Sequence, residues 1–172
     1  TGFGAFANRI IPAAKTRRLQ LNLIRSHACG TGDPLPAHIV RRMLLLKANA
    51  LAAGYSGARP LLVEILLGLL NAGVLPIIPS QGSVGASGDL APLAHIGLAL
   101  IGEGEAIRDG ALLEGDAVPH AAGFEPFELQ AKEGLALLNG TQLSLSLALE
   151  GLFQAERLLD ASIVAGALTV EG

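Results

Sequence analysis

The stretch GSVGASGDLAPLAH, residues 82–95, places one serine between two small residues in a glycine-rich segment. Within the triplet Ala86-Ser87-Gly88, the amide nitrogen of Gly88 has no side chain beside it to hinder attack on the carbonyl carbon of Ala86. Ring closure followed by dehydration across Ser87 would yield a conjugated electrophile. These residue types in this order therefore indicate a reactive group built from the chain itself.

Two other interpretations of the glycine-rich segment compete with that chemistry. A phosphate-binding loop would use glycines to expose backbone N–H groups at a helix start. The segment lacks the lysine and the serine or threonine of that motif, and Asp89 would repel a phosphate. The simpler alternative is a structural turn, which the residues alone leave open.

Composition limits the classes of function. The 172 residues carry a formal net charge of -3 and only 3% aromatic side chains, which disfavours nucleic-acid binding. Cys29 is the only cysteine, so an internal disulfide and a multi-cysteine zinc site are excluded and a reducing, cytoplasmic compartment is favoured. No membrane span is expected, because the charge-free stretches 65–88 and 134–149 are interrupted by polar residues or prolines. No metal site is expected either.

The spacing of apolar residues predicts a mainly α fold, in which long helices form a bundle core with a small β-hairpin excursion. Asp109 and Gly110 mark the turn of the hairpin, near 107–113, and TGDPLP at 31–36 is expected to form a turn. No linker or repeat divides the chain, so 1–172 is expected to form a single, partial domain. The expected helices cover 16–28, a segment ending near 53, 60–72, 90–101 and, as one buried helix, 130–159.

The glycine-rich segment resembles the signature of the histidine and aromatic amino acid ammonia-lyase family. Five further segments resemble family segments in the family's order, so the resemblance covers nearly the whole chain. It implies that Ala86, Ser87 and Gly88 become a 4-methylideneimidazol-5-one prosthetic group, with Ser87 losing its hydroxyl, and that no metal or nucleotide is needed. The five segments are TGFG at 1–4, LQLNLIRSHACGTGDPL at 19–35, GYSGAR at 54–59, GEGEA at 102–106 and KEGLALLNGTQ at 132–142.

The resemblance also implies roles for three residues outside the triplet. Asp89 matches an acid that assists proton removal during cyclisation, and its position equally predicts a helix N-cap. Asn139 matches an asparagine that hydrogen-bonds the electrophile or the substrate. Gln142 is expected either to bind substrate or to satisfy a buried backbone group.

Ser26 and His27 indicate the substrate class within that family. Histidine lyases resemble this chain in having Ser-His at this position, whereas the phenylalanine and tyrosine lyases have an aromatic residue or histidine followed by leucine. His27 can exchange a hydrogen bond with a substrate imidazole, although a lone histidine at a helix end is more often structural. The implied reaction is elimination of ammonia from L-histidine to urocanate, a step of histidine catabolism. The alternatives are a tyrosine or phenylalanine lyase, an aminomutase, or a non-catalytic helical assembly module.

The chain departs from the family pattern at the catalytic base. Family members carry a tyrosine four residues before TGFG, which would lie upstream of Thr1, and Tyr55 is the only tyrosine and does not match it. We therefore expect an internal part of a longer protein that is inactive alone. The resemblance implies a homotetramer in the parent protein, with sites shared among subunits, and a small amino acid as the substrate.

Overall fold

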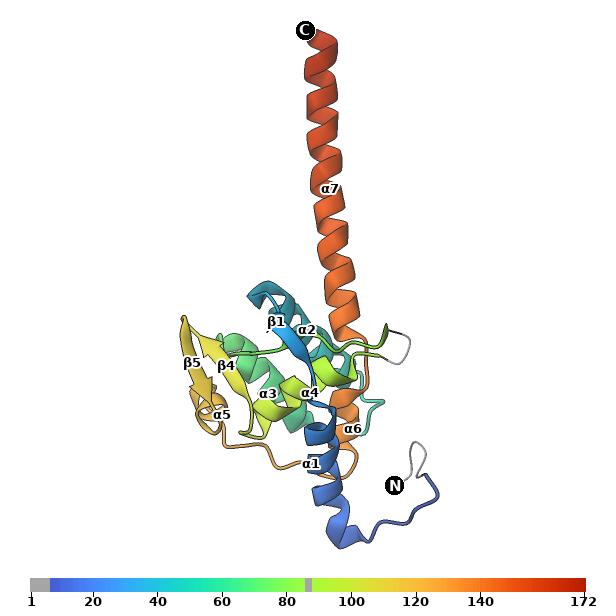
Figure 1. The fold of residues 1–172 in the computed structure, drawn as a ribbon, viewed down its shortest axis with the longest axis vertical. Helices are drawn as coiled ribbons and strands as arrows, with labels where there is room; N and C mark the ends of the chain where they lie inside the picture. The colour runs from blue at the N-terminus through green and yellow to red at the C-terminus, as the bar shows by residue number, and fades with distance from the viewer. Residues whose placement is uncertain (1–6, 86–87) are drawn as a thin grey trace.

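The structure is a computed structural model that describes residues 7–85 and 88–172. It shows a helical body from which one long helix projects (Figure 1). The mainly α fold predicted from the sequence is confirmed. The helices are the 3-10 turn η2 (Ala13–Lys15), α1 (Thr16–His27), α2 (Ala37–Ala52), α3 (Pro60–Asn71), α4 (Leu90–Leu100), α5 (Ala117–Ala121), α6 (Glu133–Leu138) and α7 (Gln142–Glu171).

The core forms where α2, α3 and α4 bury their apolar side chains. Leu62, Leu66 and Leu69 recur at helical spacing along α3 and are inaccessible to solvent. Pro60 stands in the first turn of α3, as predicted, where its missing N–H costs nothing. The helix after the glycine-rich segment, α4, is apolar on nearly all sides and is correspondingly buried.

The predicted hairpin is present as β4 (Glu105–Arg108) and β5 (Ala111–Glu114), which pair in an antiparallel manner. Asp109 and Gly110 both have positive φ, 51° and 81°, as a two-residue hairpin turn requires. Strand β2 (Leu75–Pro76) adds to β4 on the other side, so that this sheet has the order β2-β4-β5.

A second sheet contradicts the turn predicted at 31–36. Residues Thr31–Pro34 form strand β1, which pairs antiparallel with β3 (Pro79–Gln81), and Thr31 lies opposite Gln81. The residue before a proline favours the extended conformation, which is compatible with a strand as well as with a turn. The prediction was wrong because the partner strand is 45 or more residues away in the sequence.

The prediction of one buried helix at 130–159 was also wrong. The helical segment is interrupted at Asn139, which has an extended ψ of 124°, and α7 then begins at Gln142. Beyond Ser146 no residue of α7 is buried, and apolar side chains such as Leu158 and Leu168 are more than half exposed. In the described part of the chain, neither α7 nor any other helix is long and apolar enough to cross a bilayer.

An ion pair fastens the start of α6 to the loop before α3. Glu133 is 1% exposed and accepts hydrogen bonds from Arg59 Nε at 2.8 Å and Arg59 Nη2 at 2.7 Å. The backbone N–H of Gln130 also donates to it, at 2.7 Å. Burial acts to raise the pKa of Glu133, but the hydrogen bonds from Arg59 and from backbone N–H groups hold that pKa below its ordinary value.

We expect Glu133→Gln to lower the free energy of unfolding of the full-length protein at pH 7 by about 2 kcal/mol, because Arg59 loses a carboxylate partner. A depressed carboxylate pKa stabilises the fold above pH 4.5, and this contribution is lost as the pH falls through the folded-state pKa. Denaturant titrations should therefore show that wild type and variant converge as the pH falls below 4.5 and through the folded-state pKa of Glu133. The exposed Glu128, paired with Arg17, provides the control: Glu128→Gln should change stability by less than about 0.5 kcal/mol. A Glu133 effect that persists unchanged at low pH would contradict this account.

Candidate active site

Gly88 lies against the turn that follows α6. Its φ is +91°, and a β-carbon built on it would stand 2.9 Å from the carbonyl oxygen of Gly140. The next residue reinforces the contact, since the N–H of Asp89 donates to that same Gly140 oxygen at 2.9 Å. Ala86 and Ser87, the other members of the triplet, lie outside the described residues. The structure therefore joins the end of the glycine-rich segment to the predicted Asn139 region.

The Asp89 carboxylate is fully buried and accepts three hydrogen bonds. The hydroxyls of Ser83 and Ser144 donate to Oδ1 at 2.7 and 2.8 Å, and the N–H of Ser144 donates to Oδ2 at 2.9 Å. Asp89 does occupy the residue before α4, but its side chain makes no capping bond to that helix. The predicted N-cap position is therefore confirmed, but the side chain does not cap α4: the carboxylate instead binds the first turn of α7, where the helix dipole also favours a negative charge.

Asn139 is held through its backbone and leaves its side chain available. Its carbonyl oxygen accepts a hydrogen bond from Lys47 Nζ at 2.6 Å, and its N–H donates to Leu135 at 3.0 Å. The side chain is exposed and has no hydrogen-bond partner within residues 7–85 and 88–172. The side-chain amide of Asn139 is therefore available to donate a hydrogen bond to a bound group.

Gln142 contributes a buried oxygen that lacks a partner. Its Oε1 has no hydrogen-bond donor in the part of the chain that the structure describes. This oxygen therefore does not satisfy a buried backbone group, which was one of the two roles expected for Gln142. An unpartnered buried acceptor is costly, so the site favours a donor at this atom.

His27 is oriented at the C-terminal end of α1. Its Nδ1 lies 2.8 Å from the carbonyl oxygen of Leu23 and 3.1 Å from Oγ of Ser26. A carbonyl oxygen can only accept, so Nδ1 carries the hydrogen. In the neutral ring, Nε2 is then an acceptor. The contact with Ser26 Oγ helps to fix the orientation of the ring.

The β1–β3 ribbon brings the His27 segment to the glycine-rich segment. A β-carbon on Gly82 would approach the Cα of Gly30 at 3.3 Å, so the two backbones nearly touch. His95 of α4 accepts a hydrogen bond from the Gly30 N–H at 3.2 Å, and burial lowers the pKa of His95 and favours this accepting form. His27 thus stands just before one strand of the ribbon, and Gly88 lies just after the other.

Comparisons with known proteins identify the family of this chain. The family model described as aromatic amino acid lyase matches residues 1–172. This chain belongs to the aromatic amino acid lyase family. A histidine ammonia-lyase from Paracidovorax citrulli is 57% identical over 171 residues, which cover 99% of this chain and 33% of that protein. The chain thus spans about a third of the length of the curated relatives it matches.

Solved structures of the lyase family have the same fold. Histidine ammonia-lyase from Trypanosoma cruzi superposes with a TM-score of 0.83 at 43% identity, over 90% of this chain and 30% of that one. A phenylalanine aminomutase from Pantoea agglomerans superposes with a TM-score of 0.87 at 36% identity, over 93% of this chain and 31% of that one.

The sequence analysis missed three residues that contact the candidate site. Ser83 lies within the glycine-rich segment and Ser144 within the apolar segment after it, but nothing local marks either as a partner of Asp89, because the Ser144 contact depends on two distant segments meeting there. Lys47 did have a signal: it continues the apolar stripe of Val40, Met43 and Leu44 along α2, where a charged side chain is unexpected.

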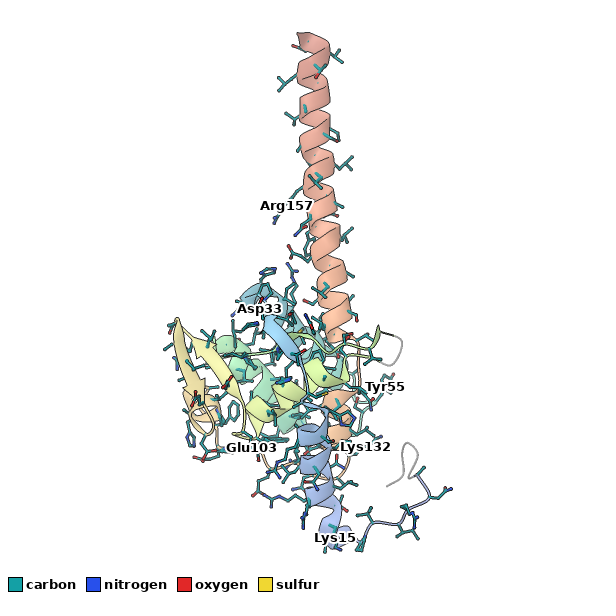
Figure 2. All side chains as sticks on the ribbon, viewed as in Figure 1. Lys15, Asp33, Tyr55, Glu103, Lys132 and Arg157 are labelled. Atoms are coloured by element: carbon teal, nitrogen blue, oxygen red, sulfur yellow. The ribbon has the colours of Figure 1, made fainter. Side chains whose placement is uncertain are left out.

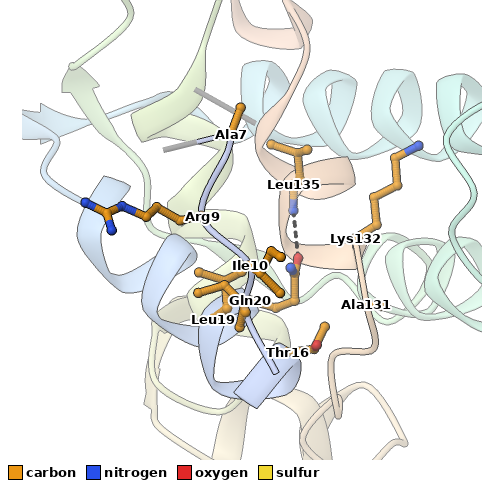
Figure 3. A pocket seen from close by; sticks show the side chains of 10 residues that line it. Ala7, Arg9, Ile10, Thr16, Leu19, Gln20, Ala131, Lys132 and Leu135 are labelled. Carbon is orange, nitrogen blue, oxygen red and sulfur yellow. Dashed lines mark hydrogen bonds between the residues drawn. The ribbon is translucent and has the colours of Figure 1, made fainter. Parts of the chain in front are cut away.

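A cavity of about 500 Å³ lies elsewhere in the lyase chain, between the segment before α1, α1 itself and α6 (Figure 3). Within it, Gln20 accepts a hydrogen bond from the N–H of Leu135 at 3.2 Å. None of the predicted site residues that the structure describes lines this cavity. Tyr55 does not line it either and is 94% exposed at the surface (Figure 2).

Proposed function

We propose that the protein to which this chain belongs is a carbon–nitrogen lyase that eliminates ammonia from L-histidine to give urocanate. The observation that carries the reaction class is the contact of Gly88 and Asp89 with Gly140, which sets the Asn139 turn beside the glycine-rich segment. The choice of histidine is supported by relatives named histidine ammonia-lyase, which are 52–57% identical across the chain.

The residues around Gly88 fit a prosthetic group made from Ala86, Ser87 and Gly88. Gly88 adopts a left-handed conformation, and the space where a side chain would stand is closed by the Gly140 carbonyl, so only glycine is accommodated there. A 4-methylideneimidazol-5-one held there would supply an electron-poor double bond as the acceptor for the substrate amine.

The other residues of the site bind and orient. The Asn139 amide donates a hydrogen bond to the prosthetic group or to the substrate. The Nε2 lone pair of His27, oriented by Leu23 and Ser26, accepts the N–H of the substrate imidazole, and Oε1 of Gln142 accepts from the substrate ammonium. Asp89 assists proton removal during cyclisation and holds the surrounding serines in place.

The apolar side chains exposed along α7 support a homotetrameric parent protein. Phe153, Leu158, Ile163 and Leu168 are each at least 40% exposed on one projecting helix (Figure 1). Surfaces of this kind mark contacts with other chains. In this proposal, 1–172 is part of one domain of a cytoplasmic enzyme, and the catalytic tyrosine comes from residues beyond this chain.

Two measurements on the full-length protein test the proposal. Mass spectrometry should find the triplet-containing peptide lighter by two waters, and incubation with L-histidine should produce the ultraviolet absorbance of urocanate. Cyclised protein that forms cinnamate or coumarate, or a β-amino acid, would favour the tyrosine or phenylalanine lyases or an aminomutase, the latter supported by the fold shared with the Pantoea agglomerans enzyme. An uncyclised protein that does not react with borohydride would favour the non-catalytic helical module.

His27→Leu is expected to lower kcat/KM for histidine by about a hundredfold in the full-length protein, because a hydrogen-bond partner of the substrate is replaced by an apolar group. Activity toward phenylalanine or tyrosine should rise relative to histidine. His120→Leu is the control, since His120 is half exposed and pairs with Glu125, away from the ribbon. Unchanged discrimination in His27→Leu would assign the histidine a structural role.

A further inference from the structure

Lys47 is a buried cation for which the proposed reaction has no use so far. It lies on α2, is 2% exposed, and directs Nζ to the Asn139 carbonyl oxygen at 2.6 Å. Among the described residues no carboxylate pairs with it: Asp89 is engaged by serines, Glu150 on α7 by Arg42, and Glu64 on α3 is exposed. Its hydrogen bond to the Asn139 turn is therefore its principal polar contact.

That bond completes a two-sided hold on the turn. On one side, the Asp89 N–H donates to the Gly140 carbonyl, and on the other, Lys47 donates to the Asn139 carbonyl. These two successive carbonyls lie on either side of the Gly140 Cα, so both peptide units of the turn are held. Without Lys47, the backbone that carries the Asn139 side chain would be fixed only at its N–H and at Gly140.

We propose that Lys47 is a positioning residue for the reaction: by holding the Asn139 carbonyl, it fixes the backbone from which the Asn139 amide is presented beside Gly88. The proposal rests on the function proposed above. It assigns Lys47 no contact with substrate, and it predicts that loss of the Lys47 ammonium disturbs the site more than it disturbs the fold.

Energetics support a role in the site over a role in the core. Burial lowers the pKa of Lys47 to about 8, so folding disfavours its charged form. A methionine or leucine would fill the same apolar stripe without that penalty. Lysine is therefore less favourable than an apolar residue if the side chain only fills the core. Its hydrogen bond to the Asn139 turn gives the ammonium a function that an apolar residue lacks.

The test compares three variants of the full-length protein: Lys47→Met, Lys47→Arg and, as a matched control, Lys15→Met on the exposed η2 turn. Lys47→Met should lower kcat about tenfold or more, with a smaller change in KM, while the melting temperature stays equal or rises. Lys47→Arg, which retains a donor and a charge, should recover most of kcat. Lys15→Met should behave as wild type.

Hydrogen exchange provides a readout independent of turnover. Peptides that cover Asp89 and residues 139–144 should exchange faster in Lys47→Met than in wild type or Lys15→Met. If wild type makes no urocanate and exchange still accelerates, the proposed function fails and the positioning role of Lys47 holds. If Lys47→Met keeps kcat within twofold and exchange is unchanged, the positioning role is wrong. A loss of kcat that follows a lower melting temperature and is not rescued by Lys47→Arg also overturns it.

Discussion

Gly88→Ala is expected to reduce kcat/KM of the full-length protein by about a hundredfold or more, because displacement of the triplet backbone misaligns the site. The φ of +91° is unfavourable for alanine, and its β-carbon would stand 2.9 Å from the Gly140 oxygen. Relief of that contact must move either Gly88 or the turn that carries Asn139. The strain should also lower the free energy of unfolding by about 2 kcal/mol.

Gly54→Ala separates the two causes of the Gly88 effect, which are the positive φ and the close contact with the Gly140 oxygen. Gly54 has a similar φ of +83°, but a β-carbon there would meet no atom within 4 Å. The Gly54 variant should therefore lose only about 1 kcal/mol of stability and keep its activity and its cyclised triplet. Intact-mass measurement should find the two-water loss missing from Gly88→Ala alone. A Gly88→Ala protein that is fully cyclised and active would refute the close-contact explanation.

Asp89→Ala should have the second large effect. It removes a buried acceptor of three hydrogen bonds and leaves the donors of Ser83 and Ser144 without a partner. We expect a loss of about 3 kcal/mol in the free energy of unfolding, since the variant loses three hydrogen bonds to a charged group, each of which contributes about 1.5–3 kcal/mol, and avoids the cost of burying that charge. Activity should fall with it, because the start of α7 is no longer tied to the residue that follows Gly88.

Asp89→Asn distinguishes charge from geometry in that effect. The amide keeps the size of the side chain and can still accept from the Ser144 N–H, so stability should fall by only about 1 kcal/mol. Asp33→Ala, at an exposed position in β1, is the matched control and should leave both stability and activity near wild type. Melting curves of the four full-length proteins check the order. Equal losses in Asp89→Asn and Asp89→Ala would show that the charge itself is required.

Local patterns sufficed for the elements that depend on local physics. The helices at 16–28, 60–72 and 90–101 follow from apolar spacing and from the glycines and prolines at their ends, and the structure confirms them to within a few residues. The hairpin turn at Asp109 and Gly110 was likewise predictable, because two residues with positive φ are a local requirement.

The contacts that assemble the site were not predictable in the same way. The β1–β3 ribbon depends on two short strands that meet only in the folded chain, and neither has an alternating apolar pattern. Asp89 was assigned to the nearest helix, α4, although its carboxylate binds the more distant α7. A capping preference identifies a residue that can cap, but it does not identify which helix end lies within reach.

The end of the chain shows a different limit. Leucine and alanine content predicted burial for 130–159, yet α7 leaves most of its apolar side chains exposed. Composition indicates how much free energy a segment gains when its apolar side chains are buried. It does not indicate whether the residues that bury them belong to the same chain.

The bonds at Asp89 also constrain the order of events during synthesis. Ser144 is 55 positions later than Asp89, and Asn139 is 92 positions later than Lys47. During synthesis, the glycine-rich segment is therefore translated well before the residues that hydrogen-bond to it. If cyclisation of the triplet requires the contacts with residues 139–144, it cannot occur until those residues have docked. The cyclised triplet would then be found only in chains in which this docking had taken place.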